Sequence, residues 1–301
     1  MITDGIINVN KPSGMTSHDV VSVLRRRLKI KRIGHTGTLD PMATGVLPVC
    51  IGRATRIIEY YEADMKSYTA ELKLGLRTDT LDITGEVLEE KPFDGVTEGA
   101  ISEASKSFDG WIEQTPPMYS ALKVNGKKLY EYAREGKEVE IKSRKVFLEG
   151  MRVYDINLDD GSMKLDVTCS KGTYIRTIID DLGQMLGCGA TMTALVRTKS
   201  GVFTLEDSAE LEDLKSMSDD AIEAVMIQPD KTLVNLGAIE LHPKRFVPFC
   251  NGMSTRSTGY KIKEEGVLSE YKVYSEGKFA GIGKIREGEL IPVKVIGNAG
   301  N

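Results

Sequence analysis

Strand-like and helix-like segments follow one another irregularly along this chain of 301 residues, and their order restricts the fold more than any other feature. Strand-like runs are predicted at 6–9, 67–76 and 163–169, and in 67–76 apolar residues alternate with polar ones. Apolar residues at helical spacing predict amphipathic helices that start at Thr16 or Ser17, at 101 and at 174. Because the two kinds of segment do not alternate as βαβ units do, we expect an α+β fold in which helices flank a largely antiparallel mixed sheet.

The glycine-rich segment 34–49, GHTGTLDPMATGVLPV, carries the strongest local signal for chemistry. Pro41 pushes the backbone of Asp40 towards extended geometry, and the glycines allow tight turns and close approach of a ligand. Their spacing matches neither GxGxxG nor GxxxxGK[ST], so a nucleotide phosphate loop is not expected. A carboxylate on a stiff loop suits a nucleophile or a general base. The alternative from local chemistry is an Asx-turn.

His35 is the histidine nearest to Asp40 in sequence, which raises the question of a hydrolytic triad. No G-x-S-x-G segment accompanies the pair, so a serine hydrolase is not supported. Arg176 would lie in the first turn of a helix, where the helix dipole disfavours a cation. That position suggests a carboxylate partner from elsewhere in the chain; the alternative is an ordinary exposed arginine.

Three further residues have two interpretations each. Tyr68 lies on a strand and could be either core or catalytic. Asp79 and Asp82 are three residues apart and could bind a metal or close a turn.

The four cysteines are scattered without a CxxC pair, and the three histidines lack ligand spacing, so neither a metal site nor a disulfide framework is expected. The first ten residues lack the pattern of a signal peptide, and no apolar run suits a membrane span; we therefore expect a cytoplasmic protein.

Charge is unevenly distributed although the formal net charge is only −4. Residues 11–56 contain nine lysines and arginines and two acids, Asp19 and Asp40. Residues 206–230 show the reverse balance, with a single basic residue, Lys215. Because phosphate contacts are local, the basic segment keeps a nucleic-acid interaction open, and its alternative is a solvated helix face.

Five longer segments occur in a fixed order: VNKPSGMTSHDVV, GHTGTLDPMATGVLPVCIGRATR, KSYTAELKLGLRTDTLDITG, PPMYSALKVNGKKLYEYAREG and CSKGTYIRTIIDDLGQMLGCGA. In this order they resemble the motifs of the bacterial tRNA pseudouridine-55 synthases, the TruB family. The resemblance covers roughly residues 5–195, about two thirds of the chain.

The resemblance implies an isomerase that acts on the T-loop uridine of tRNA at position 55, the residue that precedes a conserved cytidine. The N1–C1′ bond breaks, the uracil turns, and a C5–C1′ bond forms, so no cofactor and no metal is needed. The implied partner is the T-arm stem-loop of tRNA, without a guide RNA, an obligate protein partner or a membrane. A uridine stacked inside a T-loop must first be flipped out of the stack.

The resemblance also implies roles for individual residues. Asp40 stands where the family has its catalytic aspartate, Arg176 where an arginine pairs with it, and Tyr68 where a tyrosine stacks on the base. The other implied substrate-binding positions are His35 in flipping, Tyr174 and Leu195 around the uracil, Lys11 near the site, and Arg56, where some relatives have lysine. Asp79 is a candidate for a supporting carboxylate behind these residues.

Two parts of the chain lie outside this expected catalytic centre. Residues 1–236 are expected to form the catalytic domain, and 237–301, rich in strand-like runs and turns, a small β-barrel that resembles the PUA type of RNA-binding module. Within the first domain, residues 118–145 mix eight basic residues with four glutamates and three tyrosines. So many charges cannot be buried unpaired, which suggests an insertion that clamps RNA; the alternative is a permanently ordered surface helix-loop.

Other functions remain open at this stage. An RNA-binding folding helper could use the same surfaces without chemistry, alone or as a second activity of the enzyme. The guide-RNA-dependent catalytic subunits of archaea and eukaryotes share the aspartate motif, but long basic tails would be expected there. An N-glycosidase would release free uracil.

Overall fold

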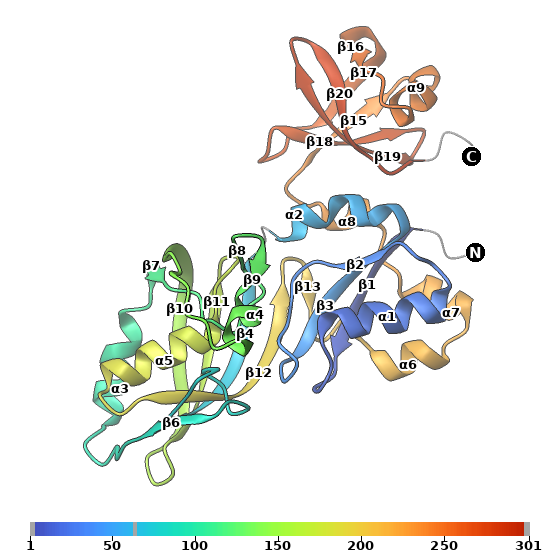
Figure 1. Ribbon diagram of the computed structural model, residues 1–301. Helices are drawn as coiled ribbons and strands as arrows, with labels where there is room; N and C mark the ends of the chain where they lie inside the picture. The colour runs from blue at the N-terminus through green and yellow to red at the C-terminus, as the bar shows by residue number, and fades with distance from the viewer. Residues whose placement is uncertain (1–3, 63–64, 298–301) are drawn as a thin grey trace.

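A single bent sheet with helices against it forms most of the protein (Figure 1). The computed structural model describes residues 4–62 and 65–297. The main path of the sheet runs through β14 (Ala209–Glu210), β1 (Gly5–Lys11), β3 (Thr44–Ile51), β12 (Ala190–Ser200), β4 (Lys66–Leu74), β11 (Ser162–Cys169), β10 (Arg144–Asn157) and β7 (Gly110–Gln114). Off this path, β2 (Ile33–His35) pairs with β3 and β13 (Phe203–Thr204) pairs with β12. Among the described pairs in this sheet, only β1 with β14 and β3 with β12 are parallel, which confirms the expected largely antiparallel α+β fold.

The sheet supports two lobes that meet at β12. In the first lobe, α1 (Ser17–Leu28), α6 (Leu211–Ser216) and α7 (Asp219–Val225) accompany β1, β2 and β3 (Figure 1). In the second lobe, α3 (Glu98–Lys106) and α5 (Ile175–Met185) lie against β4, β11 and β10. Each lobe has its own apolar cluster, and β12 pairs with β3 on one side and β4 on the other. A residue on β12 can therefore contact both lobes.

Local sequence explains where α1 begins. Thr16 is its N-cap: the hydroxyl of Thr16 accepts the backbone N–H of Asp19 at 3.1 Å, and the Asp19 carboxylate accepts the backbone N–H of Thr16 at 2.9 Å. This capping box satisfies N–H groups that have no partner within the helix. The predicted start at Thr16 or Ser17 is thus confirmed at Thr16. The basic last turn of α1 meets the acidic segment, where Arg27 forms an ion pair with Asp219 at 2.9 Å.

The strand predicted for 67–76 is interrupted by a glycine. Gly75 adopts a φ of 78°, which is unfavourable for residues with a side chain, so β4 ends at Leu74. The chain then starts β5 (Leu76–Thr78), which leaves the large sheet and pairs with β6 (Val87–Glu90). The turn at the tip of this short hairpin contacts α5, because Arg176 of that helix donates a hydrogen bond to the carbonyl of Thr80.

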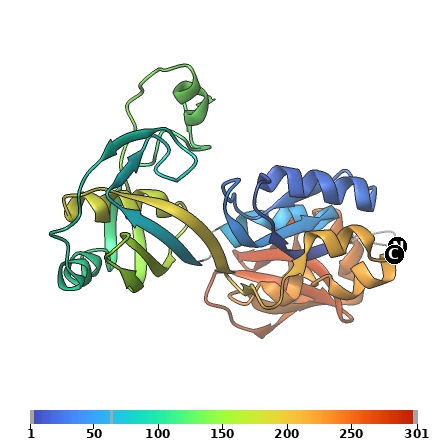
Figure 2. The same cartoon turned by 90° about the horizontal axis from the view of Figure 1, so that it is seen from below.

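The segment 118–145 contains a two-stranded hairpin and a short helix. The hairpin pairs β8 (Lys123–Val124) with β9 (Lys127–Lys128), and α4 (Leu129–Arg134) follows directly. Asn125 and Gly126 form its turn, both with positive φ. Figure 2 shows the segment extending away from the edge of the large sheet.

The chain from Gly237 onward forms a second, six-stranded sheet, which confirms the expected β-rich module. Its order is β16 (Thr255–Arg256), β20 (Glu289–Val295), β19 (Lys278–Arg286), β18 (Glu270–Ser275), β15 (Gly237–Leu241) and β17 (Tyr260–Glu264). Turns at Glu276-Gly277 and Glu287-Gly288 close hairpins, with positive φ at all four residues. Asn251-Gly252 follows the single-turn helix α9 (Phe246–Cys250), which accompanies this sheet.

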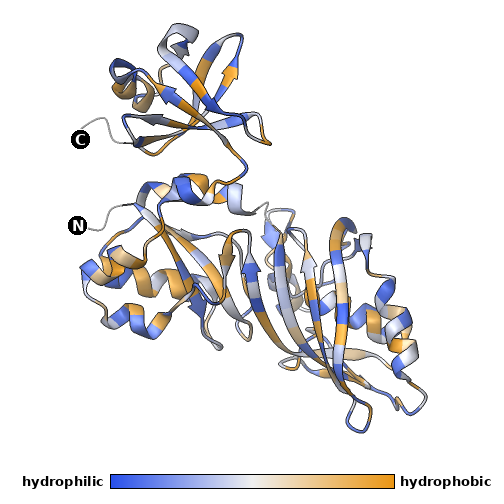
Figure 3. Cartoon of the chain, turned by 180° about the vertical axis from the view of Figure 1, so that it is seen from behind, coloured by the Kyte–Doolittle hydropathy of each residue, from blue (hydrophilic) through white to orange (hydrophobic). Residues whose placement is uncertain are grey.

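The module packs on the first lobe through η1 (Gly52–Ile57), α2 (Ile58–Glu62) and α8 (Pro229–Thr232). Ile282 and Ile296 of the module share an apolar cluster with Ile57 and Tyr61. Figure 3 shows apolar residues distributed along the strands of both sheets rather than gathered in one long run. Among the described residues, no helix is both long and apolar enough to cross a membrane.

Candidate active site

Asp40 lies on the loop between β2 and β3, and several hydrogen bonds fix that loop. The hydroxyl of Ser17 accepts the backbone N–H of Leu39 at 2.8 Å and donates to its carbonyl at 3.2 Å. The carbonyl of Asp40 accepts the backbone N–H of Ala43 at 3.1 Å, which closes a turn through Pro41. The Asp40 side chain stays 34% exposed, so the carboxylate is held by its backbone while remaining accessible.

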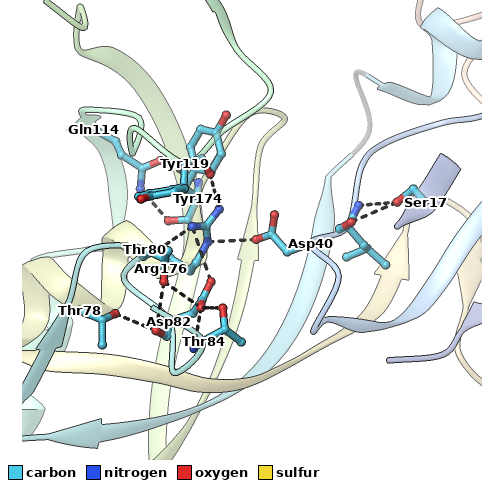
Figure 4. A network of polar contacts seen from close by, with 11 residues as sticks. Ser17, Asp40, Thr78, Thr80, Asp82, Thr84, Gln114, Tyr119, Tyr174 and Arg176 are labelled. Atoms are coloured by element: carbon cyan, nitrogen blue, oxygen red, sulfur yellow. Dashed lines mark hydrogen bonds and ion pairs between the residues drawn. The ribbon is translucent and has the colours of Figure 1, made fainter. Parts of the chain in front are cut away.

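Arg176 reaches Asp40 from the second lobe (Figure 4). Its Nε lies 3.0 Å from Oδ2 of Asp40, although only 4% of the arginine side chain is exposed. Nη1 donates to the carbonyl of Thr80 at 2.6 Å and lies 3.7 Å from Oδ2 of Asp82, and Nη2 donates to the carbonyl of Tyr119 at 3.0 Å. The predicted carboxylate partner of this first-turn arginine is therefore present. The contacts with Thr80, Tyr119 and Asp82 fix the orientation of this buried, planar guanidinium, so its Nε points towards Asp40.

The turn after β5 explains how a carboxylate comes to lie behind Arg176. Oδ1 of Asp82 accepts from the backbone N–H of Thr84 at 3.0 Å, from the Thr84 hydroxyl at 2.5 Å and from the Thr80 hydroxyl at 3.0 Å. The hydroxyl of Thr78 donates to the Asp82 carbonyl at 2.7 Å. These bonds occupy one oxygen and leave the other facing Arg176. Asp82 thus both closes a turn and supports the arginine.

Asp79, the residue named from sequence for a supporting role, lies elsewhere in this turn. Its Oδ1 accepts the backbone N–H of Glu86 at 2.8 Å. Hydrogen bonding to Asp79 also raises the pKa of the Tyr119 phenol, with burial as the second cause. Asp79 therefore holds the hairpin and the Tyr119 side chain, while Asp82 makes the contact with Arg176.

Tyr68 and Leu195 lie on adjacent strands and face the same side of the sheet. Tyr68 is on β4 and Leu195 on β12, where Leu195 pairs in register with Ala70. Their exposed fractions are 9% and 7%, so both are largely covered by protein. Burial raises the pKa of the Tyr68 phenol, which keeps it neutral at physiological pH. Only a small part of each side chain is therefore open to a ligand.

Tyr174 is the N-cap residue of α5 and has no side-chain cap of its own. The buried amide of Gln114 instead fixes the backbone of Tyr174: its Oε1 accepts the Tyr174 backbone N–H at 2.8 Å, and its Nε2 donates to the Tyr174 carbonyl at 3.0 Å. The guanidinium of Arg144 lies over the Tyr174 ring, 5.1 Å from its centroid. The start of the helix that carries Arg176 is thereby contacted by Gln114, which precedes the insertion, and by Arg144, which lies at its end.

His35 and Lys11 lie around the Asp40 loop, and burial lowers the pKa of both side chains. Burial, with a smaller contribution from the charge of Arg197, lowers the pKa of His35 to about 4, so its imidazole is neutral at pH 7. Nδ1 of His35 accepts the backbone N–H of Gly37 at 3.3 Å. Lys11 is fully buried and donates to the carbonyls of Pro12, Met15 and Pro41 at 2.8, 2.6 and 3.2 Å. Burial lowers the pKa of Lys11 to about 8, and the charge of Asp40 opposes that shift.

Arg56 has a different environment from the other residues selected from sequence. It is exposed on η1, and its Nη1 donates to the carbonyl of Val295 at 2.6 Å. The structure therefore places Arg56 at the contact with the C-terminal module rather than in the Asp40–Arg176 network.

Sequence reasoning missed Gln114 and Arg197, and it considered Asp82 for a turn or a metal but not as a partner of Arg176. Gln114 gave no signal, because its role depends on a backbone contact with a distant helix. Arg197 did give one: it lies two residues after Leu195 on a strand, so it shares the inward face with an apolar residue. In the described part of the chain, no group of three His, Cys, Asp or Glu side chains is arranged to hold a metal ion.

Comparisons with known proteins identify one family in both sequence and fold. Residues 25–175 match the family described as "TruB family pseudouridylate synthase (N terminal domain)", and residues 176–234 match "tRNA pseudouridylate synthase B C-terminal domain". Proteins named tRNA pseudouridine synthase B are 44% identical in Clostridium perfringens (93% of this chain, 95% of the relative) and 46% identical in Clostridium kluyveri (97% and 99%). The protein of that name from Symbiobacterium thermophilum is 51% identical over 70% of this chain and 71% of its own length.

Solved structures show the same fold. A structure titled as an H/ACA RNP bound to a substrate RNA containing 2′-deoxyuridine has a TM-score of 0.73 and 25% identity, covering 98% of this chain and 86% of the other. A Cbf5-Nop10-Gar1 complex gives a TM-score of 0.71 and 27% identity, with 97% and 84% covered. Together with the matches in sequence, these similarities establish that the chain belongs to the TruB family of pseudouridylate synthases.

Proposed function

We propose that this protein isomerises the T-loop uridine at position 55 of tRNA to pseudouridine, with Asp40 as the catalytic carboxylate. One observation carries the proposal: Asp40 is accessible, and a fully engaged, buried arginine from the opposite lobe holds its carboxylate in place. The relatives named tRNA pseudouridine synthase B support tRNA as the substrate.

The residues around Asp40 suit a base that has left its stack. A flipped uridine loses stacking and pairing at a cost of a few kcal/mol. Tyr68 offers a replacement stacking surface, and a neutral His35 can hydrogen-bond the displaced nucleotide without a net charge. Leu195 and Ile175 are both nearly buried, at 7% and 4% exposed, and would exclude water from the separated uracil.

The reaction is an internal rearrangement and needs no external reagent. The N1–C1′ bond breaks, and the C5–C1′ bond forms. C5 then loses its proton, and N1 gains one, so the atoms and electrons of the nucleotide balance. The roles proposed for this chain are to hold the carboxylate, place the base and keep water out.

The decisive test uses the purified protein alone with an unmodified tRNA transcript, because the proposal requires neither a guide RNA nor a partner protein. Pseudouridine mapped by nucleotide should appear at position 55 only. Pseudouridine elsewhere would reject the assigned position. Free uracil with an abasic nucleotide would instead identify an N-glycosidase.

We also propose that residues 118–145 clamp the RNA. Without RNA, the cations of this segment are held internally: Lys127 pairs with Glu135 and lies 4.8 Å from the Tyr132 ring centroid, and Lys128 lies 5.3 Å from that of Tyr130. These are exposed or half-exposed contacts, each worth little on its own. Phosphates could therefore replace them when RNA binds.

Changing Lys127 and Lys128 together to alanine should weaken binding to any tRNA sequence and flatten the salt dependence by up to about one log–log unit per lost phosphate contact. The rate at saturating tRNA should change less. The matched control is Lys215→Ala with Lys231→Ala, which removes equal charge from exposed positions within and directly after the acidic segment 206–230. Unchanged binding by the first variant at every salt concentration, or equal hydrogen exchange in 118–145 with and without tRNA, would rule out the clamp.

A further inference from the structure

Arg197 occupies the junction of the two lobes on β12. It shares the inward face of this strand with Leu195, pairs in register with Tyr68 on β4, and pairs with Gly45 on β3. Only 1% of its surface is exposed, which makes it one of the largest fully buried side chains among the described residues. Arg197 therefore lies between the strand that carries Tyr68 and the strand that follows the Asp40 loop.

The guanidinium of Arg197 binds both ends of the loop that carries Asp40. Nε donates to the carbonyl of Val46 at 2.6 Å, and Nη2 donates to the carbonyl of Gly37 at 3.2 Å. Gly37 precedes Asp40 and Val46 follows it, so one rigid, planar group sets the spacing between the loop ends. A Cβ on Gly45 of β3 would lie 2.3 Å from the carbonyl oxygen of Arg197, so β3 and β12 approach each other here too closely for a side chain.

The same guanidinium lies beside the Tyr68 phenol. Burial raises the pKa of Tyr68, and both the charge of Arg197 and its hydrogen bonding oppose that rise. The proposed catalytic loop and the proposed stacking residue thus share one neighbour.

Packing alone does not account for an arginine at this position. Within the described residues, no carboxylate forms an ion pair with Arg197, and a buried cation without a partner is costly even when carbonyls accept its protons. A methionine of similar length would fill the space at a lower electrostatic cost. What methionine could not do is bind two carbonyls from the ends of one loop.

We infer that Arg197 is a positioning residue for the reaction: it holds the Asp40 loop and Tyr68 in one fixed arrangement across the two lobes. It does not touch the base, because it is covered by protein. This inference rests on the function proposed above, in which Asp40 reacts and Tyr68 stacks on the base.

The test compares Arg197→Met and Arg197→Lys by single-turnover rate at saturating tRNA, tRNA affinity and melting temperature. Arg197→Met should slow the reaction about 100-fold, the loss typical of a misplacement of about 1 Å, with affinity within about threefold of the wild type. Arg197→Lys should recover part of this loss, because an ammonium can bind one of the two carbonyls. Millimolar methylguanidinium should accelerate Arg197→Ala, and methylammonium should do so less.

Arg245→Met is the matched control, since Arg245 also binds a carbonyl and a hydroxyl, those of Ser254 and Thr255, but in the C-terminal module. Its rate at saturating tRNA should equal that of the wild type. Wild-type rates in Arg197→Met, or a rate loss that only tracks the unfolded fraction, would overturn the inference, as would failure of both Arg197→Met and Arg197→Lys to fold. An Asp40→Asn sample in the same experiment separates the two claims: if that variant is active, the proposed function itself fails.

Discussion

Replacing Asp40 by asparagine or alanine is expected to abolish pseudouridine formation while leaving tRNA affinity within about tenfold, because the lost interaction acts in the reaction rather than in binding. Asparagine keeps the shape of the side chain and removes its charge and nucleophilicity. The loop should survive, since its bonds to Ser17 and Ala43 use backbone atoms of residues 39 and 40. Single-turnover kinetics with mapped product, beside filter binding, measures both quantities.

The matched control is Asp109→Asn, which changes a carboxylate on the surface that accepts the backbone N–H of Gly150 at 3.1 Å. It should react at the wild-type rate. The Asp40→Asn variant also tests a second proposed activity, the promotion of tRNA folding. Such an activity needs binding without chemistry and should survive in this variant. A wild-type single-turnover rate in Asp40→Asn would remove the catalytic role.

Arg176→Lys is expected to lower the single-turnover rate about 1000-fold, comparable with the loss of a well-placed charged donor at an active site. Arg176 makes separate contacts with Asp40, with the carbonyls of Thr80 and Tyr119, and with Asp82. An ammonium has one centre and cannot reproduce a planar group with this many directed bonds. A lysine should bind only some of these partners, so the carboxylate of Asp40 would no longer be held in its present position.

Stability separates the chemical effect of Arg176 from a structural one. Arg176→Met leaves the Asp82 side chain, 8% exposed, without its cation, and removal of one partner of a buried pair costs about 3–5 kcal/mol. Adding Asp82→Asn should restore much of that stability, because the buried charge is gone. It should not restore activity. If the double variant regains the wild-type rate, the arginine acts through stability alone.

Arg77→Lys serves as the control for this substitution. Arg77 also binds a carboxylate through two nitrogens, with Asp180 on α5 at 2.8 and 3.3 Å. Its side chain is 39% exposed and its partner lies outside the Asp40–Arg176 network, so the expected loss of activity is small. An equal loss in Arg77→Lys and Arg176→Lys would mean that any disturbance of α5 inactivates the protein.

Features set by short stretches of sequence could be predicted, whereas features set by distant contacts could not. The start of α1 depends on Thr16 and Asp19 alone, and the pattern was sufficient. A cation in the first turn of α5 correctly indicated a carboxylate partner for Arg176. Which of Asp79 and Asp82 would support this arginine was not predictable, because it depends on how the hydroxyls of neighbouring threonines orient the turn.

Residues whose partners lie far along the chain were hardest to assign. Arg56 bonds to Val295 in the other module, a contact created by packing between two separately patterned parts of the chain. Arg197 finds its acceptors at Gly37 and Val46, about 150 residues earlier in the sequence. The alternation of a strand can show that a charged side chain faces inward, but it cannot identify the hydrogen-bond acceptors that the side chain meets there.

The order of strands in the large sheet also affects how the chain folds during translation. β1 pairs with β14 through Val9 and Ala209, and β3 pairs with β12 through Gly45 and Arg197, while the whole second lobe lies between these partners in sequence. Contacts this distant make folding slow, because long loops must close before the pairing contributes. During translation the Asp40 loop leaves the ribosome early. It lacks the hydrogen bonds from Arg197 to Gly37 and Val46 until Arg197 has also been synthesised. The proposed active site is therefore completed only after most of the chain has been synthesised. A nascent chain that ends before β12 would carry the Asp40 loop without the strand that contacts it.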